Sequence, residues 1–434
     1  MTNPNAPEWA QNGSNIDEVL FFAEFIERYP MLCIDGKFID VNGEVDIEWL
    51  KYKVSHSIMP YVRKNLAQKV TSIINTMKLC AYGDELKPDI NRIHVRNGTL
   101  YTDGTFTDKK FFCRNRFFVN WNEECPQPVK FLNFLGELLE SEDIPTLQEY
   151  LGYCLIPSTK GQKMMFIIGN GGEGKSRIGV VLDSIFGKNM LTGSFQRIET
   201  DRFFRYNLLN KLLMIDDDMQ INALSTTGYI KNIVTAETPI DIEAKGEQSR
   251  QAEIYTRFLC FGNTAPQALY DKTEGFSRRM LIIRTKPKPV DRVDDPFLAD
   301  KFIAEKEEIF HWMFEGLKRL VSNNFCFTVS DNARRNISDA MKENCNITDF
   351  LEDDSAVAHG NFDTAGYALY TAYTVWCGDN STTPIKRDTF IRYLKDNAHR
   401  LGISYSNHVI TNEGKRVRGF TGIKPRLCTG EKYI

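Results

Sequence analysis

The residues best suited to chemistry lie in one stretch, where a glycine-rich segment ends in a lysine and a serine. It reads Gly169, Asn170, Gly171, Gly172, Glu173, Gly174, Lys175 and Ser176, and fits G-x-x-x-x-G-K-[ST] at every fixed position. Glycines allow backbone N–H groups to turn inward around phosphate oxygens. In this pattern the lysine reaches the β- and γ-phosphates of a nucleotide, and the serine hydroxyl is a ligand of Mg²⁺. The spacing therefore predicts a site for ATP and Mg²⁺.

The segments on either side of this loop have the order that a phosphate-binding loop requires. Residues 164–168 are all apolar, which predicts a buried strand of a parallel sheet. Residues 177–186 have helical spacing, and Gly187 is suited to end a helix. The N-terminus of such a helix adds a favourable dipole for an anion. An accidental glycine-rich turn would not require this order, so we favour the phosphate-binding interpretation.

Three consecutive carboxylates, Asp216, Asp217 and Asp218, follow an apolar run at residues 212–215. The run predicts a buried strand, and we expect it to lie beside the strand at residues 164–168. Asp216 would then reach the Mg²⁺ shell, and Asp217 would orient or polarise the attacking water. Asp218 is a candidate for either role. The alternative is an acidic turn after a strand. The presence of a phosphate-binding loop in the same chain makes this alternative less favoured.

Two later motifs supply an amide and a pair of cations. Asn263 follows an apolar strand predicted at residues 258–261, where its side chain can hydrogen-bond the lytic water or the γ-phosphate. Arg278 and Arg279 precede a last apolar run at residues 280–283. An arginine at a subunit edge can stabilise transition-state charge on the neighbour's γ-phosphate. Taken alone, Asn263 is equally a turn residue, and the arginines are equally a surface pair.

Residues 239–255 predict a hairpin that projects from the sheet. Ile240 and Ile242 alternate with acidic residues, and the chain then turns at Lys245 and Gly246. A lysine at a hairpin tip in a ring pore would contact the phosphates of a threaded strand. The alternative is an exposed hairpin with a solvated lysine.

The composition of the 434-residue chain is that of an ordinary globular protein, with 42% hydrophobic and 26% charged residues. No apolar run approaches the length of a membrane span, and residues 1–15 are unlike a signal peptide. The ten cysteines are scattered singly, without a C-x-x-C pair, which argues against a zinc site or a disulfide framework. These features predict a protein of a reducing cytoplasm without a membrane partner.

The net charge of -3 hides a strongly basic C-terminal segment. Residues 386–426 contain ten Lys/Arg and three Asp/Glu, a balance of +7, so the rest of the chain sums to −10. Two helices and two strands predicted within residues 356–434 indicate a winged-helix module. Lys415, Arg416 and Arg418 would lie at or beside its wing turn, where they could grip the backbone of duplex DNA. A solvated basic face is the alternative.

The pattern divides the chain into five regions. Strand–helix alternation from about residue 164 to residue 285 predicts an α/β fold with a parallel, doubly wound sheet. Shorter strands are predicted ahead of it, the last at residues 111–119. The expected regions are a helical, oligomerising region at 1–90, a small α+β region at 91–145, the core at 146–290, a helical segment at 291–355 and the winged helix at 356–434.

The order of these motifs resembles that of the superfamily 3 helicases, which are hexameric AAA+ motors of viruses and mobile elements. The chain is most similar to the helicase portion of the phage/plasmid primase–helicase family, which is related to the poxvirus helicase–primase. The likeness covers about residues 90–426. The stretches that carry it, besides the motifs above, are residues 95–100, 147–153, 201–203, 210–213, 369–377 and 420–423.

The resemblance implies an AAA+ P-loop core with ATP at the subunit interfaces of a homo-hexameric ring. By position, Lys175 and Ser176 match the residues that bind phosphate and Mg²⁺ in the family. Asp216 and Asp217 match its acidic pair, and Asn263 matches its sensor. The family also implies 3′→5′ movement on single-stranded DNA.

Three basic residues complete the correspondence. Arg279 best matches the arginine finger, with Arg278 as the alternate, and Lys245 matches the DNA contact of the pore hairpin. Many relatives carry a primase domain ahead of the helicase, but residues 1–90 are too few for one and contain no primase acidic motif. We therefore expect priming to come from a separate primase or polymerase.

The sequence as a whole predicts an ATP-dependent replicative DNA helicase of a phage, plasmid or other mobile element in a bacterial host. One alternative is an ATP-controlled origin-binding initiator, in which the winged helix does the main work and ATP only sets assembly. A second is a P-loop kinase or other small-molecule phosphotransferase. That second alternative leaves the hairpin and the basic C-terminal segment unexplained.

Overall fold

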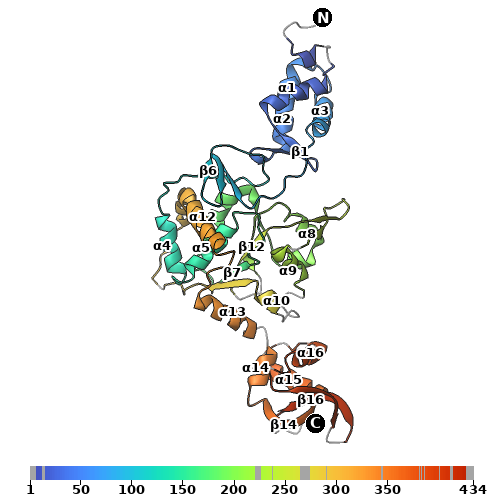
Figure 1. Cartoon of the computed structure of the whole chain (residues 1–434), viewed down its shortest axis with the longest axis vertical. Coiled ribbons are helices and arrows are strands. Elements are labelled where there is room, and N and C mark those ends of the chain that lie inside the picture. The colour runs from blue at the N-terminus through green and yellow to red at the C-terminus, as the bar shows by residue number, and fades with distance from the viewer. Residues whose placement is uncertain are drawn as a thin grey trace.

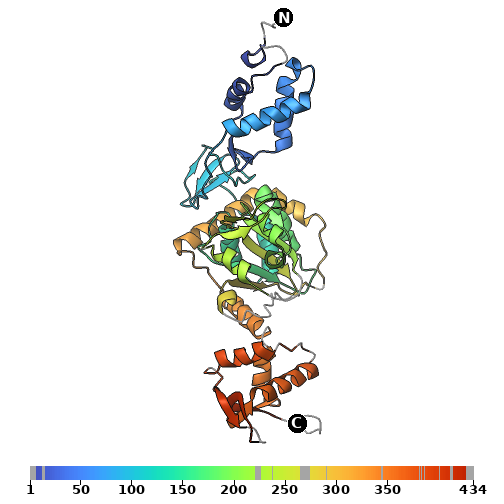
Figure 2. The same ribbon diagram turned by 90° about the vertical axis from the view of Figure 1, so that its right-hand side faces the viewer.

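The computed structural model describes residues 6–11, 15–219, 226–236, 238–263, 274–289, 291–343, 346–380, 382, 384–385, 387–399, 401–410 and 414–426. Three units follow one another along its long axis: an N-terminal helical unit, a central α/β unit and a small C-terminal unit (Figure 1, Figure 2). The glycine-rich loop lies in the central unit.

The N-terminal unit is a helical cluster with a short antiparallel sheet and a core of its own. Its elements are η1 (Glu8–Ala10), α1 (Glu18–Arg28), β1 (Leu32–Ile34), β2 (Lys37–Asp40), β3 (Gly43–Glu44), α2 (Ile47–Ile58), η2 (Met59–Tyr61) and α3 (Leu66–Cys80). Asp17 and Asp46 cap α1 and α2 by accepting hydrogen bonds from N–H groups of the first turn. Trp9, Phe21 and Leu50 belong to the buried cluster that holds these helices together.

A second small sheet joins this unit to the centre. It consists of β4 (Arg92–Val95), β5 (Gly98–Tyr101) and β6 (Phe106–Thr107). The prediction of a strand at residues 111–119 is wrong, because this segment makes only an isolated bridge to β4, between His94 and Arg116, and a side chain supplies further bonds. The buried guanidinium of Arg116 donates to the carbonyls of Val41, Val95, Gly98 and Phe111.

The central unit contains a five-stranded parallel sheet. Its strands are β7 (Met164–Ile168), β8 (Met190–Thr192), β9 (Leu213–Met219), β12 (Arg257–Gly262) and β13 (Met280–Arg284), in the order β13-β7-β12-β9-β8. The carboxylate strand β9 was expected beside β7. This is wrong, because β12 lies between them and pairs with both.

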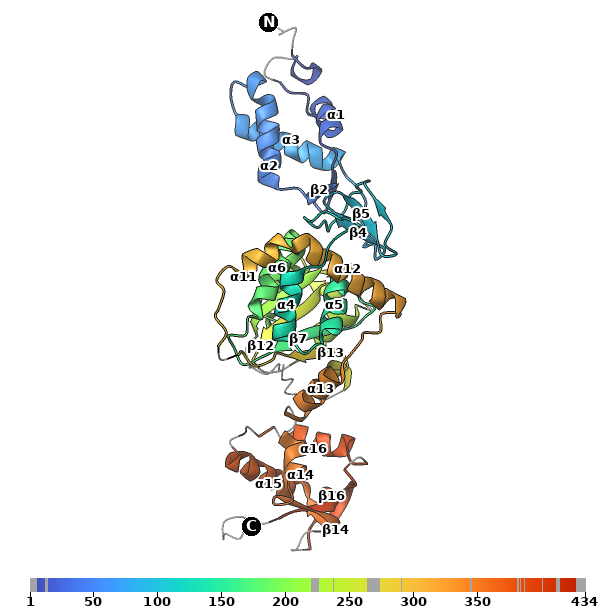
Figure 3. The same ribbon diagram turned by 90° about the vertical axis from the view of Figure 1, so that its left-hand side faces the viewer.

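Helices cover both faces of the sheet, as the doubly wound pattern predicts. They are α4 (Val129–Leu138), α5 (Ile144–Tyr153), α6 (Ser176–Phe186), η3 (Gly187–Asn189), α7 (Arg197–Thr200), α8 (Arg202–Tyr206), α9 (Gly228–Thr235), α10 (Glu274–Ser277), α11 (Leu298–Ala304), α12 (Lys306–Ser322) and α13 (Asp331–Glu343). In β7, Met165 and Ile167 pack with α4, α5, α6 and α12, whereas Met164 and Phe166 pack with α7, α8 and α9. Figure 3 shows the first group in front of the strands.

Two glycines let α5 and α12 approach closely on one face of the sheet. A Cβ atom at Gly152 would lie 2.3 Å from the carbonyl oxygen of Met313, and one at Gly316 would lie 2.4 Å from that of Gln148. The buried carboxylate of Glu149 accepts a hydrogen bond from Arg319 Nε at 2.6 Å across the same contact. The helix pair therefore supports the sheet from which the candidate site is built.

A hairpin projects from the central unit between β9 and β12 in sequence. Its strands are β10 (Ile240–Ile242) and β11 (Arg250–Ala252), which pair antiparallel as the sequence predicts. Ile240 and Ile242 are buried, so their side chains anchor the hairpin to the core, whereas Asp241 is exposed.

The C-terminal unit is a helical and antiparallel domain with its own buried cluster. Its elements are α14 (Asn346–Glu352), β14 (Val357–Ala365), α15 (Gly366–Asp379), α16 (Arg387–Asp396), β15 (Ser404–Ile410) and β16 (Arg416–Pro425). The sheet order is β14-β16-β15. Strand β14 was not predicted, and the helical segment expected at residues 291–355 extends into this unit, because α14 packs in its buried cluster. Among the described residues, no helix combines the length and the apolar character needed to cross a membrane.

Candidate functional site

The glycine-rich loop connects the carboxyl end of β7 to the first turn of α6. Gly171, Gly172 and Gly174 have φ angles of 102°, 80° and 103°, in the region that side chains other than glycine rarely adopt. A Cβ atom at Gly169 would lie 2.2 Å from Thr285 Oγ1, so this position also requires glycine. The fixed glycines of the pattern thus lie where the backbone needs them, and α6 ends at Gly187 as predicted.

The cation of the loop is bound by the loop's own carboxylate. Lys175 Nζ lies 2.8 Å from Glu173 Oε2, and the same oxygen accepts the N–H of Gly171 at 3.0 Å. Only 9% of the Lys175 side chain and 3% of the Glu173 side chain are exposed. Although burial alone would raise it, the hydrogen bond and the charge of Lys175 hold the pKa of Glu173 below its usual value.

Two side chains from after β13 also reach the loop, and neither was predicted to do so. Arg292 Nη1 donates to the backbone oxygen of Glu173 at 2.8 Å. Thr285 donates its N–H to Ile168 at 2.8 Å, and its buried hydroxyl has no hydrogen-bond partner among the described residues. Their only sequence signal is position, since both follow the strand that neighbours β7.

The three carboxylates of β9 have different environments. Asp216 is buried, its Oδ2 accepts the N–H of Phe195 at 2.7 Å, and burial raises its pKa. Asp217 and Asp218 are exposed. They lie at a bulge, because the pairing of β12 with β9 shifts between Cys260 and Gly262. The bulge brings two adjacent carboxylates to the surface near the carboxyl end of the sheet.

Asn263 completes the group at this edge of the sheet. It is exposed and directly follows β12. The carbonyl oxygen of the preceding residue, Gly262, accepts the N–H of Gly169 at 3.0 Å, so the end of β12 is bonded to the start of the loop. The fold therefore brings the loop, the exposed carboxylates and Asn263 to adjoining strand ends. Clefts at the carboxyl ends of parallel strands are the usual ligand sites of such sheets.

The arginine pair lies at the opposite edge of the same sheet. The backbone oxygen of Arg279 accepts the N–H of Met164, the first residue of β7, at 2.8 Å. The guanidinium of Arg279 donates to the carbonyl of Gly275, and Arg278 is exposed. Within one chain these arginines are separated from the glycine-rich loop by the length of β7. The structure does not bring them to the predicted nucleotide site of their own chain.

The residues predicted to contact DNA lie on two separate surfaces. Lys245 and Gly246 are exposed at the turn of the β10–β11 hairpin, and Gly246 has a φ of 86°. On the return strand, Arg250 Nη1 lies 2.8 Å from Asp35 Oδ2 of the N-terminal unit. The hairpin is thus tied by a surface ion pair to the turn between β1 and β2.

The other surface belongs to the C-terminal unit, where Lys415, Arg416 and Arg418 are exposed as predicted. The basic residues of α16 belong to the +7 segment, but none of them was predicted as a DNA contact. An open groove of about 510 Å³ runs between α16 and the β15–β16 strands. Its charged lining residues are Arg387, Asp388, Arg392, Lys395 and Arg418. We name this surface the basic groove.

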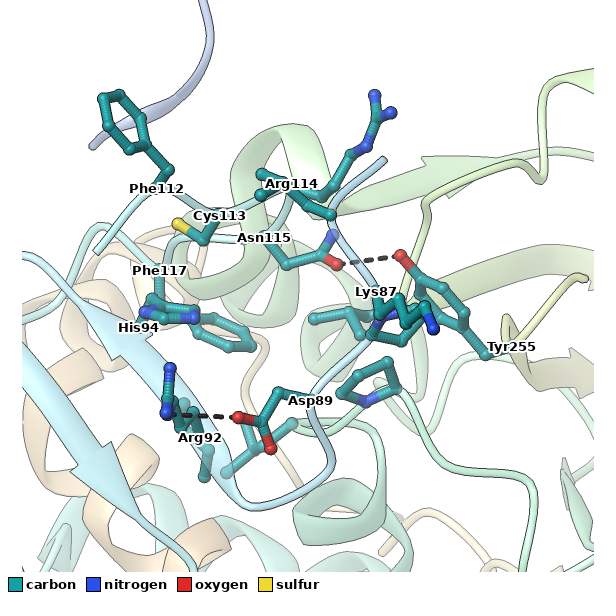
Figure 4. A pocket seen from close by; sticks show the side chains of 16 residues that line it. Lys87, Asp89, Arg92, His94, Phe112, Cys113, Arg114, Asn115, Phe117 and Tyr255 are labelled. Atoms are coloured by element: carbon teal, nitrogen blue, oxygen red, sulfur yellow. Dashed lines mark hydrogen bonds and ion pairs between the residues drawn. The ribbon is translucent and has the colours of Figure 1, made fainter. Parts of the chain in front are cut away.

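A smaller cavity of about 190 Å³ lies away from the candidate site (Figure 4). It is lined by His94 and Arg92 of β4 and by Tyr255, which precedes β12, so it adjoins the amino edge of the central sheet. Figure 4 shows the Tyr255 hydroxyl pointing at Asn115, whose Oδ1 accepts its hydrogen bond at 3.0 Å. Nδ1 of His94 is buried without a partner among the described residues.

The environment of His94 predicts an acid-sensitive contribution to stability. Burial, together with the nearby charges of Arg116 and Arg92, lowers its pKa to about 4, and Asp89 offsets this only in part. The unfolded chain therefore binds this proton more tightly, and stability falls as the pH drops below about 6.5, levelling off near 4. We expect wild type to lose about 2 kcal/mol more than His94→Gln between pH 7 and pH 5. Equal losses in urea unfolding at the two pH values would contradict this assignment.

Known proteins resemble this chain in fold rather than in overall sequence. No curated protein is similar in sequence to this chain. A family model described as "Family of unknown function (DUF5906)" matches residues 167–279, from β7 to the arginine pair.

Two solved structures of the NrS-1 C-terminal region (305–718), both apo, resemble the chain over most of its length. One has a TM-score of 0.52, 12% sequence identity and coverage of 93% of this chain and 98% of the other. The second has a TM-score of 0.50, 12% identity and coverage of 94% and 100%. The likeness is one of fold.

Proposed function

We propose that this chain is an ATP-dependent DNA helicase of the superfamily 3 type, from a phage, plasmid or other mobile element. The observation that carries the proposal is the junction of three strand ends. The glycine-rich loop with Lys175, the exposed carboxylates Asp217 and Asp218, and Asn263 all lie at the carboxyl edge of one parallel sheet. The carboxyl edge is where parallel sheets of this kind usually bind their ligands.

The residues of this edge suit ATP and Mg²⁺. The backbone N–H groups of the loop and the Lys175 ammonium are donors for phosphate oxygens. Ser176 supplies a hydroxyl at the first turn of α6, and Asp216 supplies a carboxylate that is largely buried. Bound Mg²⁺ would neutralise charge that develops on the phosphates during transfer. The fit is supported by the buried Thr285 hydroxyl, which lacks a hydrogen-bond partner among the described residues beside the loop.

The chain's own residues would then divide the work of hydrolysis. Asp217 accepts the proton of the attacking water, with Asp218 as the adjacent substitute, and Asn263 orients that water. Arg279, or its neighbour Arg278, would act on the site of another subunit, because both lie at the far edge of the sheet from their own loop. This requirement supports a ring with shared sites, for which we propose a homo-hexamer.

DNA would be engaged at the two basic surfaces. Lys245 at the hairpin turn would contact the backbone of a single strand in the ring pore. The helices and strands of the C-terminal unit follow one another along the chain in the order expected for a winged helix. Its basic groove and wing would hold duplex DNA. Priming would come from a separate primase or polymerase, and the site of action would be the cytoplasm of a bacterial host.

The basic groove also favours a second candidate, an origin-binding initiator in which ATP only controls assembly.

One test separates the helicase and the initiator from a small-molecule phosphotransferase. We expect the full chain to hydrolyse ATP and to do so several-fold faster with single-stranded DNA. ATP turnover that is indifferent to DNA and is stimulated by a small-molecule acceptor would reject both DNA-based functions.

The basic groove yields a prediction of its own. Arg392→Ala combined with Arg418→Ala should remove two phosphate contacts, so the log–log salt slope of duplex binding should fall by about 2. Binding should weaken about tenfold at moderate salt, because fewer counterions are released. The control is Lys51→Ala, an exposed lysine of the N-terminal unit. Duplex affinity measured at several salt concentrations tests whether the basic groove contacts DNA. An unchanged slope in the double variant would show that this surface is a solvated face.

A further inference from the structure

The carboxylate of Glu173 lies where the loop would hold a phosphate. Its Oε2 atom takes both the Lys175 ammonium at 2.8 Å and the Gly171 N–H at 3.0 Å. A lysine ammonium and a glycine N–H of this loop are the kinds of donor that bind phosphate oxygens in such motifs. In this structure, therefore, an anionic side chain of the loop already occupies the donors that a nucleotide needs.

This occupation is not a loose surface contact. Only 3% of the Glu173 side chain is exposed, and the pKa of the carboxyl is held below its usual value, so it carries its charge at neutral pH. The backbone of the same residue is fixed separately, since its carbonyl oxygen accepts from Arg292 Nη1 at 2.8 Å. The carboxylate can accordingly move away from Lys175 and Gly171 by rotation of its own side chain, while the loop backbone stays in place.

We infer that Glu173 is an affinity-determining residue that competes with nucleotide phosphate for Lys175 and Gly171. The inference rests on the proposed nucleotide site and adds to it. A triphosphate that binds the loop must displace this carboxylate. Its own negative charge then lies close to the like charge of the displaced carboxylate. Both effects weaken phosphate binding, and both depend on the negative charge rather than on the size of the side chain.

Glu173→Gln tests the role of charge at nearly constant shape. Calorimetric titration of the full chain with ATP and with pyrophosphate should show about tenfold tighter binding in this variant than in wild type. Titration with adenosine should show no change, because adenosine carries no phosphate. Glu173→Ala should also bind ATP more tightly than wild type. Glu137→Gln, which neutralises an exposed carboxylate on α4, should leave all three affinities unchanged.

The outcomes separate the inference from the function on which it rests. If wild type binds ATP, Lys175→Ala does not, and both Glu173 variants bind no more tightly than wild type, the inference is wrong and the nucleotide site stands. If wild type binds neither ATP nor pyrophosphate, the nucleotide site itself is wrong, and the inference is overturned with it.

Discussion

Replacing Lys175 with alanine is expected to reduce ATP hydrolysis by at least about a hundredfold, the usual cost of removing a group that stabilises transition-state charge. The lysine is the buried cation of the glycine-rich loop, with 9% of its side chain exposed. Its ammonium donates to Glu173 Oε2 at 2.8 Å, and the same oxygen accepts the N–H of Gly171. ATP binding should weaken along with turnover, because in the proposed site the ammonium would also contact phosphate in the ground state.

The same substitution has a structural side effect that must be controlled. It leaves the Glu173 carboxylate buried without its cation, and an uncompensated buried charge costs about 3–5 kcal/mol. Combining Lys175→Ala with Glu173→Gln should restore most of the lost thermal stability but none of the hydrolysis. Near-normal turnover in either protein would show that the loop is not the site of ATP chemistry.

Replacing Asp217 with asparagine is expected to separate binding from hydrolysis. An amide cannot accept the proton of the attacking water, so the turnover number should fall by about 10²–10⁴-fold, the range typical of a lost general base. ATP affinity should stay within about threefold, because the exposed carboxylate of Asp217 makes none of the loop's contacts with phosphate.

The neighbouring carboxylate is the matched control. Asp218 is also exposed and lies at the same bulge of β9, so Asp218→Asn changes charge equally at almost the same place. It should reduce single-turnover hydrolysis much less than Asp217→Asn does. The reverse result would assign the base to Asp218, and an equal, small effect of both would remove these two exposed carboxylates from the chemistry.

The spacing of residues carried most of the information about the loop, because glycine conformation and helix capping are local properties. The strand at residues 164–168, the helix that follows and its end at Gly187 all depend on neighbours in sequence, and all are confirmed. The β10–β11 hairpin was predictable for the same reason.

What the sequence could not supply was the arrangement of distant segments. The position of β12 between β7 and β9 is a property of sheet assembly, which no local pattern encodes. The apolar residues around Arg116 are typical of a strand, but the buried guanidinium of Arg116 bonds this segment to the carbonyls of Val41, Val95 and Gly98 instead. Strand β14 escaped detection because only its ends are buried, so alternation is weak along its middle.

In the candidate site, too, local patterns could be predicted and contacts between distant segments could not. The loop, the carboxylates and Asn263 were each found from their place at the end of an apolar run. Arg292 and Thr285 were missed because they reach the loop from more than a hundred residues away. The pairing of Glu173 with Lys175 also required a structure, since the pattern leaves that position free to be any residue.

Strand displacement on a forked DNA tests the central claim most directly. The full chain, with ATP and Mg²⁺, should separate the strands of a fork that carries a 3′ single-stranded tail, and Lys175→Ala should not. Lys245→Ala should unwind more slowly than wild type while binding duplex DNA equally well, because its contact would be with the threaded strand. A wild-type chain that binds the fork and hydrolyses ATP on it, yet leaves the strands paired at every protein concentration, would contradict the helicase assignment and favour an initiator.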